Sequence, residues 1–244
     1  MIKTISIGIE QQTINSFPRI VVGGFLAKGL GKAANRLGED AEQMRAARGA
    51  LLEEGLSLEN LVNDPRICGW REAFMRMGLK PSTFKSSAEQ LARRLLKGDL
   101  IRTPLPVVNL YCAISAKHVC PMGGYDLARL PERQVTVRFA RPESDRFTPL
   151  GGQAESMPLS PYVAVYACGS EIICWGFNHR DSRMTCLSTE TQDAVFFAES
   201  VTEAQLPSIK KALGELRDRL AVAGAEVGEV GFAAYNTPQA LLTF

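Results

Sequence analysis

Alternation of apolar and polar residues predicts strands at the start of the chain and through its second half. Ile5, Ile7 and Ile9 alternate with small or polar residues, as in a half-buried strand, and residues 19–25 form a second apolar run that contains two glycines. We expect these two strands to pair. Further strands are expected over residues 135–139, 162–168, 171–177 and 194–201.

Apolar residues that recur every three or four positions predict helices between these strands. One helix begins at Asp40 and ends at Gly55, and another has Asp64 as its cap and Pro65 as its first residue. Further helical segments are expected over residues 57–63, 87–98, 104–118 and 203–223.

Two local motifs complete this pattern. Ser87 and Gln90 have the spacing of a capping box at the start of a helix. Residues 121–126 contain a proline followed closely by two adjacent glycines, which predicts a loop.

Composition indicates an ordinary globular protein of one domain or two intimate lobes. The 244 residues are 45% apolar and 22% charged, which excludes a disordered or collagen-like chain. No apolar run approaches a membrane span, and Lys3 is followed by strand-like alternation instead of a signal peptide. We therefore expect a cytoplasmic protein with no membrane partner.

Cysteine and histidine usage argues against a metal site. The six cysteines include no C-x-x-C pair, and the two histidines, His118 and His179, have no ligand-like spacing to them. Reduced thiols are expected, with no metal and no cofactor.

Basic residues are concentrated between Arg66 and Arg102. This range contains nine basic and three acidic residues, so its net charge is +6. Such charges are most often solvated helix faces, but they could also contact a phosphate backbone. The candidate nucleic-acid contacts are Arg71, Lys80, Lys85, Arg93, Arg94 and Lys97.

Common catalytic motifs are missing from the sequence, and one polar cluster stands out. Residues 24–32 lack the glycine spacing of a phosphate loop, and no G-x-S-x-G elbow is present. Residues 175–182 place an amide, an imidazole, a guanidinium and a carboxylate directly after an apolar strand. This cluster is either the edge of a small polar binding site or a loop with internal hydrogen bonds.

Seven segments, in this order, resemble free-standing B3/B4 domain proteins, which are similar to the editing domain of the phenylalanyl-tRNA synthetase β-subunit. The resemblance covers roughly residues 60–220. The segments are WREAFMRMG (70–78), KP (80–81), SSAEQL (86–91, followed by two arginines), VNLY (108–111), PMGGYDL (121–127), VRFA (137–140) and WGFNHRDS (175–182, followed by Thr191).

The resemblance implies an α/β domain with a central mixed or antiparallel sheet flanked by helices. We expect the chain to contain this B3/B4-like editing domain (61–224), an N-terminal strand pair and helix that are part of the same globule (1–60), and a C-terminal extension packed on the domain (225–244). It also implies a hydrolase that removes a wrong amino acid from its tRNA in trans, with canavanyl-tRNA(Arg), or otherwise another non-cognate aminoacyl-tRNA, as the candidate substrate. The expected partners are a mischarged tRNA and, transiently, an aminoacyl-tRNA synthetase, with no DNA.

The chemistry expected for this reaction needs no nucleophilic side chain, because the aminoacyl ester is already activated and the neighbouring ribose hydroxyl can assist. The resemblance and the polar clusters give Asn109, Tyr111, Asn178 and Asp181 as catalytic candidates. The substrate-binding candidates are Ser115, His179, Arg180, Ser182, Glu171 and Asp193. For a cationic side chain the pocket would need an unpaired carboxylate, for which Asp181, Glu171 and Asp193 are candidates.

Three departures from the family pattern leave a second function open. Asn109 and Cys112 stand where the family usually has an aspartate and an asparagine, and Gly123 stands where the synthetase domain has a histidine. The glycine makes editing of tyrosine less favoured than editing of another side chain. The alternative function is a non-catalytic module of the same fold that binds tRNA or an amino acid.

Overall fold

The computed structural model describes residues 4–152 and 159–244. Its helices are α1 (Gln11–Ser16), α2 (Leu30–Ala34), α3 (Asp40–Glu53), α4 (Pro65–Arg76), α5 (Ser87–Lys97), α6 (Pro106–Lys117) and α7 (Leu206–Val222), with short 3-10 turns at Leu61–Asn63 and Glu203–Gln205. Its strands are β1 (Thr4–Ile9), β2 (Val21–Lys28), β3 (Met122–Asp126), β4 (Gln134–Phe139), β5 (Ala164–Cys168), β6 (Glu171–Trp175), β7 (Arg180–Asp181), β8 (Asp193–Ser200), β9 (Glu226–Val227), β10 (Gly231–Ala234) and β11 (Gln239–Thr243).

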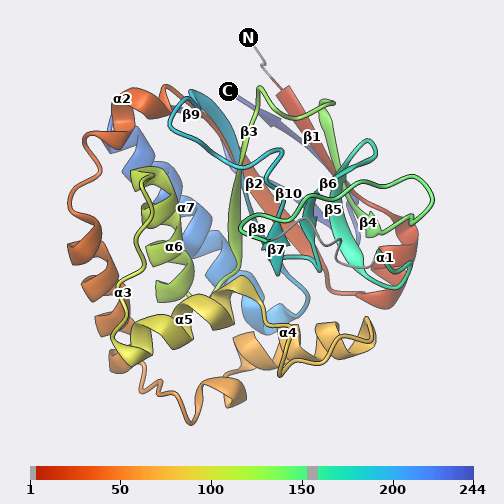
Figure 1. The fold of residues 1–244 in the computed structure, drawn as a ribbon, viewed down its shortest axis with the longest axis horizontal. Helices are drawn as coiled ribbons and strands as arrows, with labels where there is room; N and C mark the ends of the chain where they lie inside the picture. Colours follow the sequence, from red (N-terminus) through yellow and green to blue (C-terminus); the bar gives the residue numbers. More distant parts are fainter. Residues whose placement is uncertain (1–3, 153–158) are drawn as a thin grey trace.

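These strands form two sheets, so the fold is mixed α/β, as expected. The first sheet has the order β11-β1-β4-β5-β6-β7, in which only the β1–β4 pair is parallel. The second has the order β10-β2-β8-β3 with β9 added beside β2, and its pairs are antiparallel. Figure 1 shows α2, α3, α6 and α7 on one side of the second sheet, α4 and α5 below the sheets, and α1 apart from them beside β4.

Three apolar clusters hold the layers together. The first lies between the two sheets and includes Ile7, Val195 and Phe197, with Trp70 and Phe74 of α4 packed against it. The second joins the other face of the second sheet to α6 and α7, and the third joins α3, α5 and α6. Because the first cluster fills most of the space between the sheets, any polar side chain there must find a partner or line a cavity.

The expected pairing of the first two strands is wrong. β1 pairs with β11 and β4, whereas β2 pairs with β8, β9 and β10 in the other sheet. Both strands are apolar enough to be central in a sheet, and each finds its partners far along the chain. Local pattern does not encode those partners.

The expected loop over residues 121–126 is also wrong, because Met122–Asp126 form β3, which pairs with β8. Its glycines are required by close packing in the sheet. A Cβ atom on Gly124 would lie 2.8 Å from Cε1 of Phe196, and one on Gly123 would lie 2.8 Å from Oη of Tyr125. Here glycine indicates close approach and does not mark a turn.

The cap of α5 lies one residue before the predicted one. Oγ of Ser86 accepts a hydrogen bond from the amide of Glu89 at 3.2 Å, so Ser86 is the cap and Ser87 is the first helical residue. The Nε2 atom of Gln90 donates to the carbonyl oxygen of Lys85 instead of closing a capping box. This one-residue difference leaves the Ser87 hydroxyl free of the capping role.

Candidate functional site

A polar cavity opens between the two sheets at the end where β7 lies beside β3 and β8. It contains about 380 Å³ of space, part of it open to solvent. Its lining residues come from both sheets, from the loop before β7 and from the start of α5: Ser87, Met122, Gly123, Tyr125, Tyr166, Cys174, Phe177, Asn178, His179, Arg180, Asp181, Phe197 and Glu199.

Two carboxyl groups in this cavity are each held by a tyrosine. The hydroxyl of Tyr125 donates to Oδ1 of Asp181 at 2.8 Å, and the hydroxyl of Tyr166 donates to Oε2 of Glu199 at 2.9 Å. Glu199 is 3% exposed. Each pair joins one sheet to the other, because Tyr125 and Glu199 belong to the second sheet while Tyr166 and Asp181 belong to the first.

Burial makes both carboxyl groups weaker acids than usual. It raises the pKa of Glu199 to about 7, and the charge of Asp181 acts in the same direction, whereas the side-chain amide of Asn178 and the hydroxyl of Tyr166 lower it in part. Burial likewise raises the pKa of Asp181, although Cys174 and Tyr125 beside it lower the pKa in part. Carboxyl groups with raised pKa values that line a cavity are common in active sites.

Several polar atoms around the cavity have no hydrogen-bond partner among the described residues. They are both side-chain amide atoms of Asn178, Oε1 of Glu199 and the hydroxyl of Ser87. The Asn178 amide nevertheless lies near enough to Glu199 to lower the pKa of that carboxyl group. Asn178 is 8% exposed. Because buried polar groups are normally paired, these atoms are suited to hold a polar ligand or a reacting water.

His179 is fixed at the mouth of the cavity. Its ring lies against Phe74, Phe84 and Trp175, and burial lowers its pKa, so it is neutral at pH 7. Nδ1 lies 2.8 Å from the carbonyl oxygen of Lys85, which can only accept, so Nδ1 carries the proton and Nε2 remains an acceptor.

Four of the predicted site residues meet in this cavity: Asn178, His179, Arg180 and Asp181. Arg180 is exposed, and its Nη1 donates to the carbonyl oxygen of Leu150 at 3.1 Å. Part of the polar cluster at residues 175–182 therefore lines a cavity, and its role in binding a ligand stays a prediction.

The predicted wall of Asn109, Tyr111 and Ser115 does not face the cavity, because α6 packs on the opposite side of the second sheet. Oδ1 of Asn109 accepts from the amide and hydroxyl of Thr103, and its Nδ2 donates to Oδ2 of Asp40 at 2.8 Å, so it joins α6 to α3. Tyr111 packs edge-on against Phe196 within the second apolar cluster.

Ser115 and three other predicted contacts also lie outside the cavity. Ser115 donates to the carbonyl oxygen of Cys120 at 2.6 Å, and Ser182 accepts from the amide of Met184 at 3.1 Å. Glu171 forms an ion pair with Arg146 at 2.6 Å. Asp193 begins β8, six residues before Glu199 and thus about 20 Å away along an extended strand.

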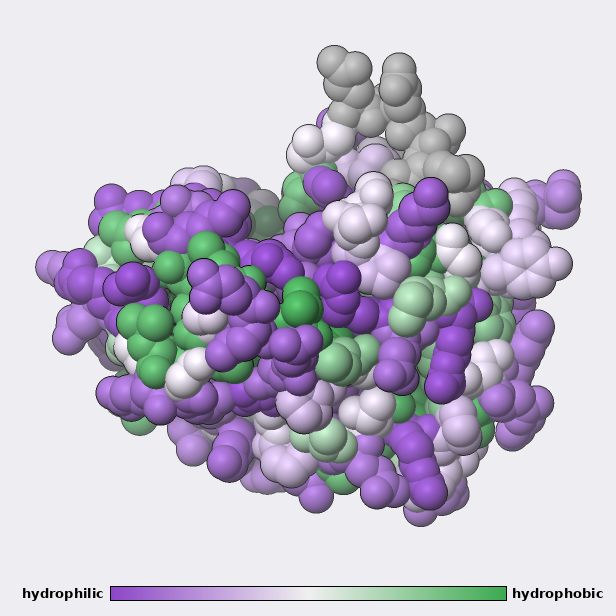
Figure 2. Space-filling model, turned by 90° about the horizontal axis from the view of Figure 1, so that it is seen from below, coloured by the Kyte–Doolittle hydropathy of each residue, from purple (hydrophilic) through white to green (hydrophobic). Residues whose placement is uncertain are grey.

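The basic candidates divide into two groups. Arg71 and Arg93 both bind the buried carboxylate of Glu89, each at 2.9 Å, so their charges stabilise the junction of α4 and α5. Lys80, Arg94 and Lys97 are exposed, while half-buried Lys85 donates to the carbonyl oxygen of Ser82. The view from below in Figure 2, towards the side on which α4 and α5 lie in Figure 1, shows a mostly hydrophilic surface with a smaller hydrophobic area.

Sequence reasoning missed Tyr125, Tyr166 and Glu199. The alternation of side chains along β8 could have revealed the glutamate. Positions 195, 197 and 199 share one face of this strand, and Val195 and Phe197 face the other sheet. Glu199 is therefore an acid on an inward-facing strand position. Its tyrosine partners belong to strands distant in sequence.

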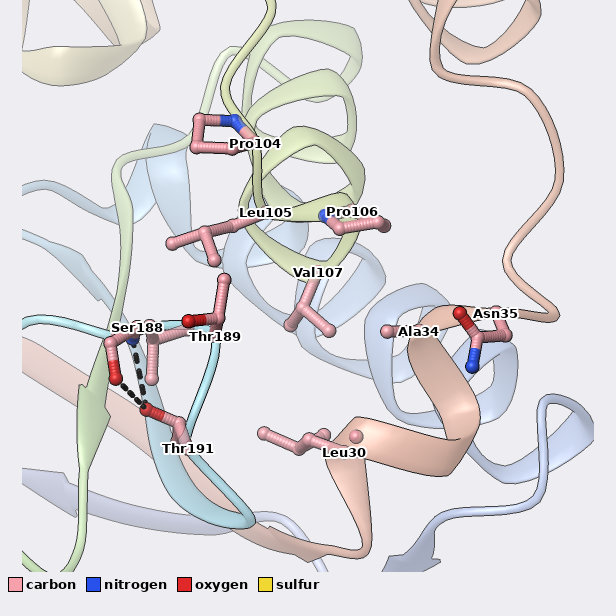
Figure 3. A pocket seen from close by; sticks show the side chains of 12 residues that line it. Leu30, Ala34, Asn35, Pro104, Leu105, Pro106, Val107, Ser188, Thr189 and Thr191 are labelled. Carbon is pink, nitrogen blue, oxygen red and sulfur yellow. Dashed lines mark hydrogen bonds between the residues drawn. The ribbon is translucent and has the colours of Figure 1, made fainter.

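A second cavity lies between α2, the start of α6 and the loop before β8 (Figure 3), with about 610 Å³ of space. Leu30, Leu105 and Val107 point toward it, and Thr191 and Ser188 are hydrogen-bonded to each other across its polar side. No acidic or basic side chain lines it, and none of the predicted site residues does. The polar cavity is therefore the better candidate for chemistry.

No three histidine, cysteine or acidic side chains converge as a metal ion would require, as far as the described residues go. Within the same residues, no helix is both long and apolar enough to span a bilayer.

Together, the two sheets with their covering helices and the polar cavity between them define a mixed α/β domain with a buried polar site. The chain belongs to the B3/4 domain family, whose model matches residues 69–220. The matched range runs from α4 into α7 and contains every residue that lines the polar cavity, from Ser87 to Glu199.

Among solved structures, the chain is similar to an N-terminal fragment of the phenylalanyl-tRNA synthetase β-subunit from Pyrococcus horikoshii. The two share 15% sequence identity with a TM-score of 0.42, and the match covers 50% of this chain and 41% of that one. The chain thus matches less than half of that fragment's length. No curated protein matches the chain.

Proposed function

We propose that this protein is a hydrolase that removes the amino acid from a mischarged aminoacyl-tRNA in trans, with the ester bound in the polar cavity. The observation that carries the proposal is the set of buried, unpartnered polar atoms around Asp181, in a cavity that lies wholly within the B3/4 range. The motif resemblance supports the reaction class, and canavanyl-tRNA(Arg) is the first substrate to test.

Asp181 is the proposed proton acceptor. Its raised pKa makes its carboxylate a stronger base than an exposed one, and the hydrogen bond from Tyr125 fixes its orientation. It would take a proton from the attacking water, directly or through the neighbouring ribose hydroxyl. The unpartnered Nδ2 of Asn178 would donate to the oxygen that becomes negative as water attacks the ester carbon.

No covalent intermediate is needed in this scheme. The ester is already activated, so fixing a water between Asp181 and the carbonyl carbon supplies most of the acceleration through orientation. Asn109 has no part in it, because all its side-chain bonds go to Thr103 and Asp40.

The test is ester loss from a panel of mischarged tRNAs that includes canavanyl-tRNA(Arg) and tyrosyl-tRNA(Phe). We expect the protein to accelerate deacylation of at least one, and Asp181→Asn to slow that reaction by about 100-fold or more. Asp218→Asn, the same change at an exposed position of α7, is the matched control and should keep full activity.

Two results would contradict the proposal. The first is no acceleration for any member of the panel, and the second is an unchanged rate in the Asp181→Asn variant. If tRNA still binds in the first case, the function is the non-catalytic binding module. In the second case the protein is a deacylase, but Asp181 is not its proton acceptor.

A further inference from the structure

The polar cavity contains more acid than the proposed hydrolysis uses. Asp181 serves as the base, but Glu199 lies on the facing sheet with Oε2 held by Tyr166 and with Oε1 unpartnered. The titratable and charged groups around Glu199 are Cys120 before β3, Tyr125 of β3, Tyr166 of β5, Cys174 of β6, His179 before β7, and Arg180 and Asp181 of β7. Burial lowers the pKa of His179, so it supplies no positive charge at pH 7.

None of these groups neutralises Glu199. Burial holds the pKa values of Tyr125, Tyr166, Cys120 and Cys174 well above their usual range, so all four are uncharged at pH 7. Arg180 is the only permanent cation among the described residues lining the cavity, and its guanidinium is exposed and directed to Leu150.

We propose that Glu199 is a cation-binding residue: its carboxylate, together with the amide oxygen of Asn178, receives a protonated nitrogen of the aminoacyl group, and this cation displaces a proton that Glu199 otherwise holds. The inference rests on the proposed function for the identity of the occupant. It assigns a specificity role to a residue distinct from the proposed base.

The geometry favours a cation over a neutral polar group. Oε1 of Glu199 and Oδ1 of Asn178 are buried and unpartnered, and two oxygen acceptors directed into one cavity match the several N–H donors of an ammonium or guanidinium group. A buried carboxylate without a counter-charge is costly, so the site without ligand favours the protonated acid. An entering cation removes that cost, and the proton leaves to solvent.

The proton and the cation therefore compete for one carboxyl group. With a pKa of about 7 for Glu199, the fraction ready to bind a cation falls about tenfold between pH 8 and pH 6. A neutral ligand of the same shape has no such dependence.

The experiment measures the affinity of small probes by NMR titration of the full chain at pH 6, 7 and 8. The probes are n-butylguanidinium and n-butylammonium, which stay charged throughout, and n-butylurea as the neutral isostere. We expect about tenfold weaker binding of at least one cation at pH 6 than at pH 8, and no pH dependence for the urea. A guanidinium preference assigns the site to a side chain, and an ammonium preference assigns it to the α-amino group.

Two variants test whether Glu199 itself causes the cation affinity and its pH dependence. Glu199→Gln should lower cation affinity at pH 8 at least tenfold and abolish the pH dependence. Tyr166→Phe removes a hydrogen bond that lowers the pKa of Glu199, so the midpoint of the pH dependence should move upward. Tyr166→Phe keeps the carboxyl group of Glu199, so the shift of its midpoint tests the inference even if Glu199→Gln fails to fold.

The inference is overturned if the cations bind no better than the urea at pH 8, or if their affinity does not change with pH. Because these probes carry no ester and no tRNA, that failure leaves the deacylation assay untouched. Conversely, an inactive protein that still binds cations in this manner would contradict only the proposed function.

Discussion

Glu199 makes the stability of the folded protein depend on pH, whatever binds in the cavity. Its folded pKa of about 7 exceeds the unfolded value of about 4.5, so the folded state holds more protons between these values. Stability must therefore fall as pH rises from about 4.5 to 7 and stay level above that, by about 3 kcal/mol in total for this group.

Glutamine at position 199 cannot ionise, so a protein with this substitution does not lose stability between pH 4.5 and pH 7 through this residue. We expect the free energy of unfolding of Glu199→Gln, relative to the natural protein, to increase between pH 4.5 and pH 7 and then to remain constant. Urea unfolding of both proteins at steps of half a pH unit measures the difference between their free energies of unfolding. The contributions of the other titrating groups cancel in this difference. A difference that does not vary with pH would show that Glu199 titrates normally.

The residues of the site show what sequence reasoning can and cannot reach. Asn178 and Asp181 were predicted, because consecutive polar residues after an apolar strand are visible in the sequence itself. Tyr125 and Tyr166 were not, because their partners are 56 and 33 residues away and become neighbours only when the two sheets face each other. Asn109 was assigned to the site because polarity alone does not distinguish a cavity residue from a satisfied junction between helices.

Among the elements, β2 and β8 form a closely packed central pair in the second sheet, and glycine makes it possible. A Cβ atom on Gly24 would lie 2.7 Å from the backbone oxygen of Phe196 and 2.7 Å from Cδ1 of Phe197. Because backbone cannot move aside as a flexible side chain can, we expect Gly24→Ala to lower the free energy of unfolding by about 1–3 kcal/mol.

Gly49 in α3 is the matched control, since a Cβ atom there meets nothing within 4 Å. Gly49→Ala should raise the free energy of unfolding by about 0.5–1 kcal/mol through helix propensity alone. Chemical denaturation of both variants measures the contrast. Equal effects of the two substitutions would mean that the strand pair tolerates the extra methyl group.

Elements with a strong periodic pattern were predicted well from sequence, and those defined by their neighbours were not. The helix opened by Asp64 and Pro65 has the predicted start, and the hairpin of β5 and β6 lies where alternation placed it. β3 was interpreted as a loop because its glycines have no local signature that separates a turn from close packing. Its strand character depends on β8, which lies about 70 residues later.

On the scale of the whole molecule, α5 begins at the polar cavity and carries two exposed basic residues towards its other end. The amide of Ser87 donates to the carbonyl oxygen of Asn178 at 3.2 Å, so α5 starts at the cavity. Arg94 and Lys97 lie on the same helix, about 10–15 Å further along its axis. A tRNA whose acceptor end enters the cavity would thus bring its backbone phosphates near these two side chains.

This arrangement predicts which basic residues contribute to tRNA binding. Arg94→Glu with Lys97→Glu should weaken tRNA binding and reduce the slope of log affinity against log salt by about 1.5–2, because two phosphate contacts are lost. Arg45→Glu with Arg48→Glu makes the same charge change at exposed positions of α3 and should have a much smaller effect. Filter binding at several salt concentrations measures both, and equal losses in the two double variants would mean that only net charge matters.

A selective loss in the α5 variant would instead place the acceptor stem along α5. The Asp181→Asn variant should then bind tRNA normally while failing to release the amino acid.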